Sequence, residues 1–253
     1  MTGQILVSGA GRALMEKTND PLHDYTLSLT GKDNPRVLFL GTATGDDPYY
    51  ILTFYDTYNS EKCRPAHLRL FHITVQDLRP FILKHDVIHV GGGNTANMLD
   101  VWRRHEVDKA LRDAWEGGAV MTGGSAGAIC WFEGGTTDSF GPELKPLNDG
   151  LGFLKGSLCP HYDAAGRQPL YHQTLLDGSL PPGYAMDNFA MIQFRGTDLV
   201  GAVASQQDQR AFQVRLEDGK VVEDPIVVKI IAGAATRRAC WRCCPRRRGS
   251  RHA

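Results

Sequence analysis

Short apolar runs alternate with helix-length stretches through the first half of the chain. The runs occupy residues 4–8, 36–41, 68–73, 87–90 and 119–122 and are rich in Val, Ile and Leu. Runs of this length are typical of strands that are buried on both faces of a parallel sheet. The stretches at residues 48–60, 75–84 and 94–116 predict helices, and apolar positions recur every three or four residues in the last of them. This alternation predicts an α/β fold, a three-layer sandwich around a mostly parallel, doubly wound sheet.

The pattern changes in the second half of the chain. Residues 134–152 are polar and rich in Gly and Pro, which predicts a long surface excursion. Residues 154–162, 184–194 and 198–205 predict further strands, and residues 211–214 and 220–223 flank an Asp-Gly turn that is typical of a hairpin. No repeat or linker interrupts the sequence. We therefore expect a single domain over residues 1–226, followed by an atypical basic, Cys-containing tail over residues 227–253 that we expect to be disordered.

Composition excludes several classes of protein. Lys and Arg together number 28, as do Asp and Glu, so no net charge favours nucleic acid or a membrane surface. No apolar run approaches the roughly 18–20 residues of a membrane span, and the N-terminus lacks the features of a signal peptide. Cys240 and Cys243 have zinc-like spacing, but no second pair follows them. We expect a cytoplasmic protein, monomeric or homodimeric, with no metal or cofactor.

The segment Ala119–Gly127 reads AVMTGGSAG and carries the strongest chemical signal. An apolar strand stops, Ser125 lies among glycines, and a helix-like segment follows, which is the context of a nucleophile elbow. Such a turn exposes the serine hydroxyl at the carboxyl end of the strand and aims the N–H groups of the next helix at it. The alternative is that Ser125 is only the N-cap residue of that helix.

A serine nucleophile needs a base, and the base needs a group that fixes its tautomer. His161 is the best-placed histidine because it follows a predicted strand beyond the elbow, at the end where open α/β sheets place their sites. Asp187 is the preferred orienting acid because it interrupts an apolar strand, where an ionised carboxylate needs a partner. An Asp-Asn pair also favours turns, so Asp187 as a turn residue stays open. Asp163 and Asp138 are weaker candidates.

Three glycines, Gly91 to Gly93, end another predicted strand, and the longest predicted helix begins at Asn94 or Thr95. Such a turn offers bare backbone N–H groups to an anion. The spacing matches neither common nucleotide-binding glycine motif. Beside a serine nucleophile, the N–H groups of Gly93 and Ala126 are instead expected to form an oxyanion hole.

The motifs VGGGNT, GGSAGA, PHYD and GYAMDN, in this order, resemble peptidase family S51, which includes peptidase E (aspartyl dipeptidase) and cyanophycinase. The resemblance runs from about Gln4 to Pro225. It implies a class I glutamine-amidotransferase-like fold and a Ser–His–acid triad that needs no metal or cofactor. Carried onto this chain, it gives Ser125 as the nucleophile, His161 as the base and Asp187 as the third member.

Resemblance to peptidase E further implies a serine exopeptidase that hydrolyses short peptides, including dipeptides with an N-terminal aspartate, through an acyl-enzyme. The aspartate carboxylate would need a cationic or donor-rich pocket. Asn94 and Arg167 are candidate substrate-binding residues, and Arg195 is a further option. A cyanophycinase-like or esterase-type hydrolase would keep the triad and change the pocket, and a non-catalytic small-molecule-binding protein with the same fold is a third possibility.

Overall fold

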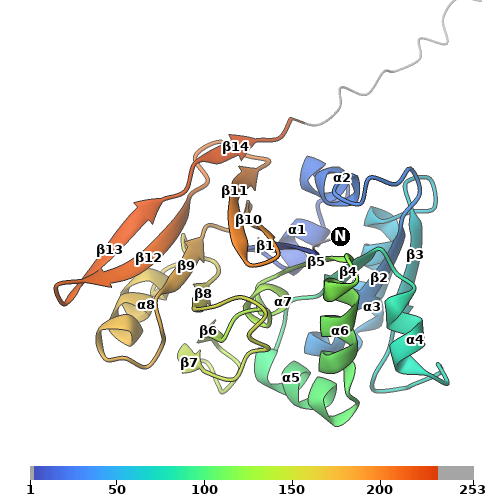
Figure 1. The fold of residues 1–253 in the computed structure, drawn as a ribbon, viewed down its shortest axis with the longest axis horizontal. Coiled ribbons are helices and arrows are strands. Elements are labelled where there is room, and N and C mark those ends of the chain that lie inside the picture. The colour runs from blue at the N-terminus through green and yellow to red at the C-terminus, as the bar shows by residue number, and fades with distance from the viewer. Residues whose placement is uncertain (1–2, 233–253) are drawn as a thin grey trace, which may run out of the picture.

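The computed structural model describes residues 3–232, and its centre is an eight-stranded sheet (Figure 1). Five neighbouring strands of this sheet, β1, β5, β4, β2 and β3, are parallel. In contrast, β10 runs antiparallel to β1, and β11 runs antiparallel to β10. In spatial order the strands are β14 (Val228–Ile230), β11 (Asp198–Ala204), β10 (Ala190–Arg195), β1 (Gln4–Ser8), β5 (Val120–Gly124), β4 (Val87–Val90), β2 (Arg36–Leu40) and β3 (Arg64–Leu68).

Helices cover both faces of this main sheet because its strands are apolar on both sides. In β2, Val37 and Phe39 pack with Tyr50 and Phe54 of α3, whereas Leu38 and Leu40 belong to the cluster that contains α5 and α6. The helices are α1 (Arg12–Met15), α2 (Pro21–Ser28), α3 (Pro48–Thr57), α4 (Leu78–Leu83), α5 (Thr95–Arg104), α6 (Val107–Glu116), α7 (Ala126–Ile129) and α8 (Arg167–Leu176), with a 3₁₀ turn, η1, at Thr42–Thr44. The molecule is therefore an α/β sandwich, as the sequence predicts.

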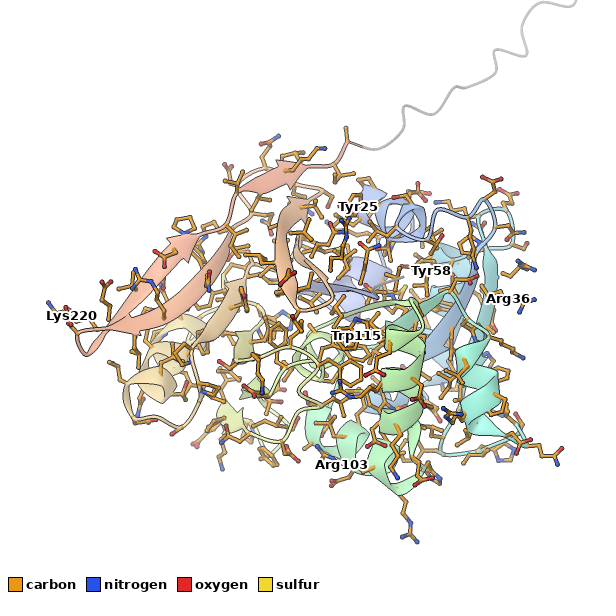
Figure 2. The ribbon with its side chains drawn as sticks, in the orientation of Figure 1. Tyr25, Arg36, Tyr58, Arg103, Trp115 and Lys220 are labelled. Carbon is orange, nitrogen blue, oxygen red and sulfur yellow. The ribbon has the colours of Figure 1, made fainter. Side chains whose placement is uncertain are left out.

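A second, six-stranded sheet lies beside the main sheet (Figure 1). Its strands in spatial order are β13 (Lys220–Pro225), β12 (Ala211–Glu217), β9 (Gly183–Met186), β8 (Ser157–Cys159), β6 (Gly134–Thr137) and β7 (Lys145–Leu147). The β12–β13 hairpin turns at Asp218 and Gly219, as expected, and Figure 2 shows Lys220 at its tip. Leu158 of β8 and Met186 of β9 belong to the same apolar cluster as the centre of the main sheet. The two sheets thus share a core.

Aromatic side chains extend this shared core from the helices of the main sheet toward the second sheet. Trp115, at the end of α6 (Figure 2), stacks on Phe153 with their ring centroids 5.2 Å apart. Trp131, just after α7, lies 5.3 Å from the same Phe153 ring. Because aromatic pairs bury large areas in defined geometries, Phe153 holds the ends of α6 and α7 together.

Three predicted elements differ from the structure. The strand expected at residues 68–73 lies earlier, at Arg64–Leu68, because an edge strand needs less apolar sequence than a central one. The helix expected at residues 94–116 is two helices, and the break falls at Glu106, whose φ of 56° is left-handed. The strand expected at residues 184–194 is β9 and β10, which belong to different sheets.

Two boundaries also change. The stretch at residues 134–152 is not only a surface excursion, because it contains β6, whose four residues are all buried, and β7, which pairs with β6. Order continues past the expected boundary at residue 226, because β14 pairs with β11. The remainder of the expected tail, from residue 233, lies outside the described residues. Within residues 3–232, no helix is long and apolar enough to cross a membrane.

Candidate active site

Ser125 occupies a strained turn between β5 and α7. Its φ of 56° and ψ of −118° lie outside the regions that L-residues favour, at a cost of about 1–3 kcal/mol. The turn needs glycine on both sides: a Cβ on Gly123 would lie 2.5 Å from the carbonyl oxygen of Gly127, and one on Gly127 would lie 2.2 Å from that of Val90. The predicted strand–elbow–helix arrangement is present.

The hydroxyl of Ser125 does not cap α7. Ser125 is the N-cap residue by position, but its side chain makes no capping hydrogen bond. The residue is half-buried, and its own N–H donates to the carbonyl of Ser8 at 3.2 Å. The capping alternative therefore fails, and the hydroxyl is available for chemistry at the carboxyl end of the sheet.

The backbone N–H groups of Ala126 and Gly93 are the expected oxyanion donors. Ala126 is the first residue of α7, and a residue at that position has no acceptor within its own helix. Gly93 has a φ of 141°, and a Cβ there would lie 2.4 Å from the carbonyl oxygen of Ala43, so the position requires glycine. In contrast, the N–H of Gly92 donates to the Tyr50 hydroxyl at 3.3 Å. The turn after β4 approaches Ser125 closely, since a Cβ on Gly92 would lie 3.3 Å from the serine Cβ.

His161 follows β8 in the second sheet, also with a left-handed φ, of 55°. Its Nδ1 lies 2.6 Å from Oδ1 of Asn188. Burial lowers the pKa of His161, and the nearby Arg167 guanidinium lowers it further, whereas Asn188, Asp163 and Asp138 act in the opposite direction. The ring is thus held neutral, the form that a general base needs.

Asp187 does not bond to His161 in the structure, so the expectation that it orients the base is corrected. Its Oδ2 accepts from Nε of Arg210 at 2.8 Å and from the Arg210 backbone N–H at 3.0 Å, and its Oδ1 accepts from Nη2 at 3.2 Å. The physical reason is the turn between β9 and β10. Asp187 and Asn188 lie in that turn rather than inside one strand, and it is Asn188 that reaches His161.

A short loop after β1 brings the serine and histidine sides together. Ser8 accepts the hydrogen bond from Ser125, and two residues later the N–H of Ala10 donates to the carbonyl of Asn188 at 2.7 Å. Asn188 in turn contacts His161. The described part of the chain holds no direct hydrogen bond between Ser125 and His161, and such bonds are often long before substrate binds. Ser125 is thus bonded to the end of β1, and His161 is connected through Asn188 to Ala10, two residues further along the chain.

The three candidate substrate-binding residues have different surroundings. Only 12% of the Arg167 side chain is exposed; its Nη1 donates to the Thr136 carbonyl at 3.3 Å, and its Nη2 lies 3.8 Å from the exposed carboxylate of Asp138. Asn94 caps α5 by accepting from Asn97 and also donates to the Ser139 carbonyl, so its amide has a structural role.

Arg195 lies at the wrong end of the sheet. It pairs with Gln4, at the start of β1, whereas Ser125 bonds to Ser8 at the end of that strand. Of the two candidate arginines, Arg167 is thus the one that lies close to His161.

Two cysteines near the site are poor nucleophiles. Cys159 precedes the histidine by two residues, and burial raises the pKa of its thiol to about 12. Burial also raises the pKa of Cys130, after α7, well above its usual value. Because the thiolate is the reactive form, both thiols are inert near neutral pH. Ser125 is therefore the nucleophile that the geometry favours.

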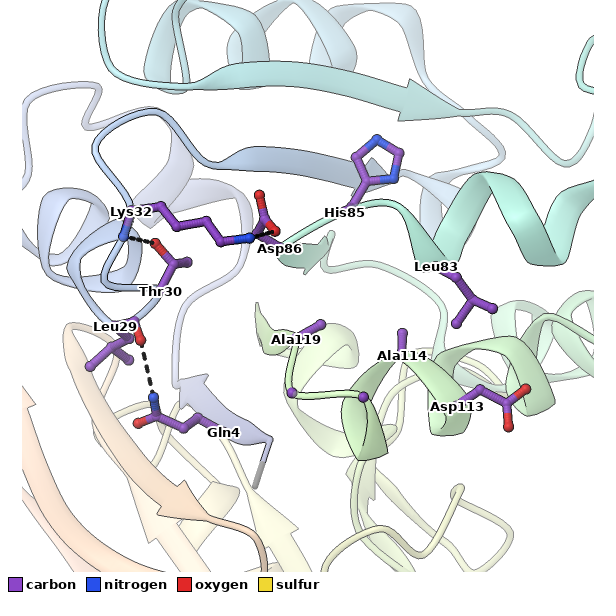
Figure 3. A pocket seen from close by; sticks show the side chains of 12 residues that line it. Gln4, Leu29, Thr30, Lys32, Leu83, His85, Asp86, Asp113, Ala114 and Ala119 are labelled. Atoms are coloured by element: carbon purple, nitrogen blue, oxygen red, sulfur yellow. Dashed lines mark hydrogen bonds and ion pairs between the residues drawn. The ribbon is translucent and has the colours of Figure 1, made fainter. Parts of the chain in front are cut away.

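A cavity of about 250 Å³ lies away from these residues (Figure 3). Gln4, Asp86 and Ala119, which line it, stand at the starts of β1, β4 and β5, the end of the sheet opposite to Ser125. Its charged residues Lys32 and Asp86 pair with each other at 2.5 Å, and the neutral amide of Gln4 donates to the Leu29 carbonyl (Figure 3). Asp113, also in the lining, pairs with Arg79 at 2.7 Å. This cavity does not contain the candidate chemistry.

An α/β sandwich with a glycine-flanked serine in a strained strand–helix turn is the arrangement typical of enzymes that use a serine nucleophile. The model of peptidase family S51 matches residues 5–201. The chain is 44% identical over 229 residues to YgaJ of Bacillus subtilis (strain 168), an uncharacterized peptidase, covering 90% of this chain and 99% of that protein. The chain belongs to peptidase family S51 and is a serine-type peptidase.

Two crystal structures share the fold. One, from Listeria monocytogenes EGD-e, is described as a peptidase E; it has a TM-score of 0.58, 17% identity, and covers 79% of this chain and 98% of its own. The other is a peptidase from an acI-B1 Actinobacterium, with a TM-score of 0.65, 16% identity, and coverage of 88% and 97%. They support the amidotransferase-like sandwich that the motifs imply.

Sequence reasoning missed Asn188. The signal was the Asp-Asn pair itself, which favours a turn. Had residues 184–194 been divided there, Asn188 rather than Asp187 could have been placed toward the histidine.

Proposed function

We propose that this peptidase hydrolyses short peptides, dipeptides with an N-terminal aspartate among them, and that Arg167 binds the aspartate side chain. The observation that carries the proposal is the nearly buried guanidinium of Arg167 beside His161. A buried cation requires a compensating charge, yet its nearest carboxylate, Asp138, is exposed and 3.8 Å away. A substrate carboxylate would supply the close partner.

The reaction follows from the groups around Ser125. Nε2 of His161 takes the hydroxyl proton as the serine oxygen attacks the scissile carbonyl. The N–H groups of Gly93 and Ala126 stabilise the negative charge on the carbonyl oxygen, a contribution of about 3–4 kcal/mol for each such donor. The imidazolium then gives its proton to the leaving amine. Water, activated by the same imidazole, releases the acyl group and restores Ser125.

A substrate panel tests this specificity. The wild-type protein would be assayed with Asp-X and X-Asp dipeptides, the matching Asn-X dipeptides, β-Asp-Arg and a p-nitrophenyl ester. We expect Asp-X to be preferred over Asn-X, because only the former carries the charge that Arg167 would bind. Preference for β-Asp-Arg would instead make the protein cyanophycinase-like, and turnover of the ester alone would make it an esterase-type hydrolase.

The arginine itself is tested by a matched pair of variants. Arg167→Met keeps most of the side-chain length and removes the charge, and we expect it to lower kcat/KM for Asp-X roughly 10- to 100-fold, the effect of losing a charge-assisted hydrogen bond. Arg195→Met removes an exposed arginine at the other end of the sheet and should change kcat/KM less than twofold. Equal effects of the two substitutions would exclude Arg167 as the anchor.

A further inference from the structure

Asn188 connects His161 to a carboxylate. Its Oδ1 lies 2.6 Å from Nδ1 of His161. On its other side, Nδ2 donates to both carboxylate oxygens of Asp163, at 2.8 and 3.0 Å, and the Asn188 backbone N–H donates to the same carboxylate at 3.1 Å. The three residues come from the segment after β8 and from the β9–β10 turn, on the side of the site formed by the second sheet.

This arrangement fixes which way the asparagine amide faces. A carboxylate only accepts hydrogen bonds, so the group that lies against both oxygens of Asp163 must be the NH₂ of Asn188. The reversed amide would place its carbonyl oxygen against two anionic oxygens. Oδ1 of Asn188 therefore faces His161.

The amide orientation in turn fixes the histidine tautomer. A carbonyl oxygen cannot donate, so Nδ1 of His161 must carry the hydrogen of the 2.6 Å bond. In the neutral ring the other nitrogen, Nε2, then has a free lone pair, and this is the atom that a general base presents to a serine. Asp163 thus acts on the tautomer of His161 through Asn188.

We propose that Asn188, held by Asp163, is the positioning residue for His161 and takes the place of the carboxylate of a Ser–His–acid triad. This role rests on the proposed function of His161 as the base for Ser125. A neutral amide orients the imidazole as a carboxylate would, but it gives less stabilisation to the imidazolium. The site gains a base that remains neutral at lower pH.

The charged groups around His161 bear on this consequence. Arg167 approaches from the start of α8, Asp163 follows the histidine in sequence, and Asp138 follows β6. Asp163 makes its hydrogen bonds to Asn188, and its charge raises the pKa of His161 by a smaller amount than burial lowers it. Burial and Arg167 together leave the pKa of His161 below its ordinary value.

Three substitutions test the role of the pair. Asn188→Ala should lower kcat on the order of 100-fold, because the ring loses its partner and can adopt either tautomer. Asp163→Ala should lower kcat by about 10-fold, because the amide is then free to rotate. Asp163→Asn, which keeps an acceptor for the NH₂ group, should recover part of that loss. KM should change little in all three. Asp177→Ala, at the far end of α8, removes a similar exposed carboxylate and should leave kcat unchanged.

An exchange variant separates positioning from mere structural support. Asp163→Asn combined with Asn188→Asp places the carboxylate directly on Nδ1 and the amide behind it. The bonding pattern survives, so activity should exceed that of Asn188→Ala, while the acid limb of kcat/KM should move up by about one pH unit because the carboxylate stabilises the imidazolium. A structural role alone would not move this limb.

The tautomer can be measured without any substrate. In ¹⁵N-labelled protein, long-range ¹H–¹⁵N correlation should show the His161 proton on Nδ1 and a pKa below 6.5, and the exchange variant should raise that pKa. A proton on Nε2 in the wild type, or a pKa unmoved by the exchange, would overturn the proposal. If the tautomer is as expected but Asp-X dipeptides are not cleaved, the proposed specificity fails and the positioning role stands.

Discussion

Around Ser125 the main sheet builds the candidate site from backbone, whereas around His161 the second sheet builds it from side chains. The serine is fixed by a strained turn whose flanking positions, Gly123 and Gly127, accept only glycine. The expected oxyanion donors are main-chain N–H groups. The histidine is fixed by hydrogen bonds through Asn188 to Asp163. A backbone device depends on fold geometry, whereas a side-chain relay can be changed one residue at a time. We therefore expect substitutions around Ser125 to abolish activity or folding, and substitutions around His161 to change the strength of the base.

The largest effect should come from Ser125→Ala. The variant removes the nucleophile and should lower Asp-X hydrolysis by at least about 10⁴-fold. The free energy of unfolding should not fall, because the hydroxyl makes no capping bond and the backbone leaves the preferred regions for any L-residue. Steady-state kinetics and urea unfolding check the two expectations. Residual activity above a few per cent would mean that another residue attacks the peptide.

Gly127→Ala should destabilise the turn at Ser125 by a steric conflict with the backbone. The added Cβ would lie 2.2 Å from the carbonyl oxygen of Val90, and we expect a loss of about 3 kcal/mol in the free energy of unfolding. Gly178→Ala is the matched control: its φ of 75° is left-handed, but nothing lies within 4 Å of an added Cβ, so the loss should be about 1 kcal/mol. Similar urea midpoints for the two variants would show that the elbow has room to spare.

Asp187→Asn distinguishes the corrected site from the one that sequence reasoning expected. The side chain is 3% exposed and pairs with Arg210, whose own side chain is 55% exposed. Neutralising it should therefore cost about 1–2 kcal/mol of stability, less than a fully buried pair would cost, and should change kcat less than about fivefold. A triad aspartate would instead lose on the order of 10⁴-fold in kcat. Unfolding and kinetics on the same preparation decide between the two.

Stability should fall on mild acidification because of a buried histidine in the main sheet. His89, in β4, is fully buried, and burial lowers its pKa to about 3. The unfolded chain binds a proton near pH 6.5, whereas the folded chain does not, so stability is complete above pH 6.5 and declines as pH falls toward 3. By pH 5.5 the loss should be about 1 kcal/mol. His89→Gln should flatten this part of a pH series of urea unfolding curves; an unchanged slope would assign the effect to other groups.

The same contrast explains what the sequence could predict. The turn at Ser125 and the glycines after β4 could be predicted from the local pattern, because a close backbone approach at these positions permits only glycine. The assignment of Gly93 and Ala126 as oxyanion donors stays a prediction. The partner of His161 could not be predicted in this way, because it depends on a turn that carries the chain from one sheet to the other. Asp187 and Asn188 differ by one position, and only the register of that turn decides that the first meets Arg210 and the second meets His161.

The fold shows a parallel difference. Central strands such as β4 and β5 are buried throughout and were predicted within a residue or two, since a continuous apolar run identifies them. The edge strand β3 and the short strands of the second sheet have few fully apolar positions, so their bounds depend on pairing partners that lie far away in sequence.

Covalent labelling of the wild-type enzyme with a fluorophosphonate, followed by peptide mapping, tests the central claim most directly. The account predicts a single adduct on Ser125, formed rapidly in the wild type and at least about 100-fold more slowly in His161→Ala, because the serine then lacks its base. An adduct on another residue, or equal labelling rates in the two proteins, would contradict it.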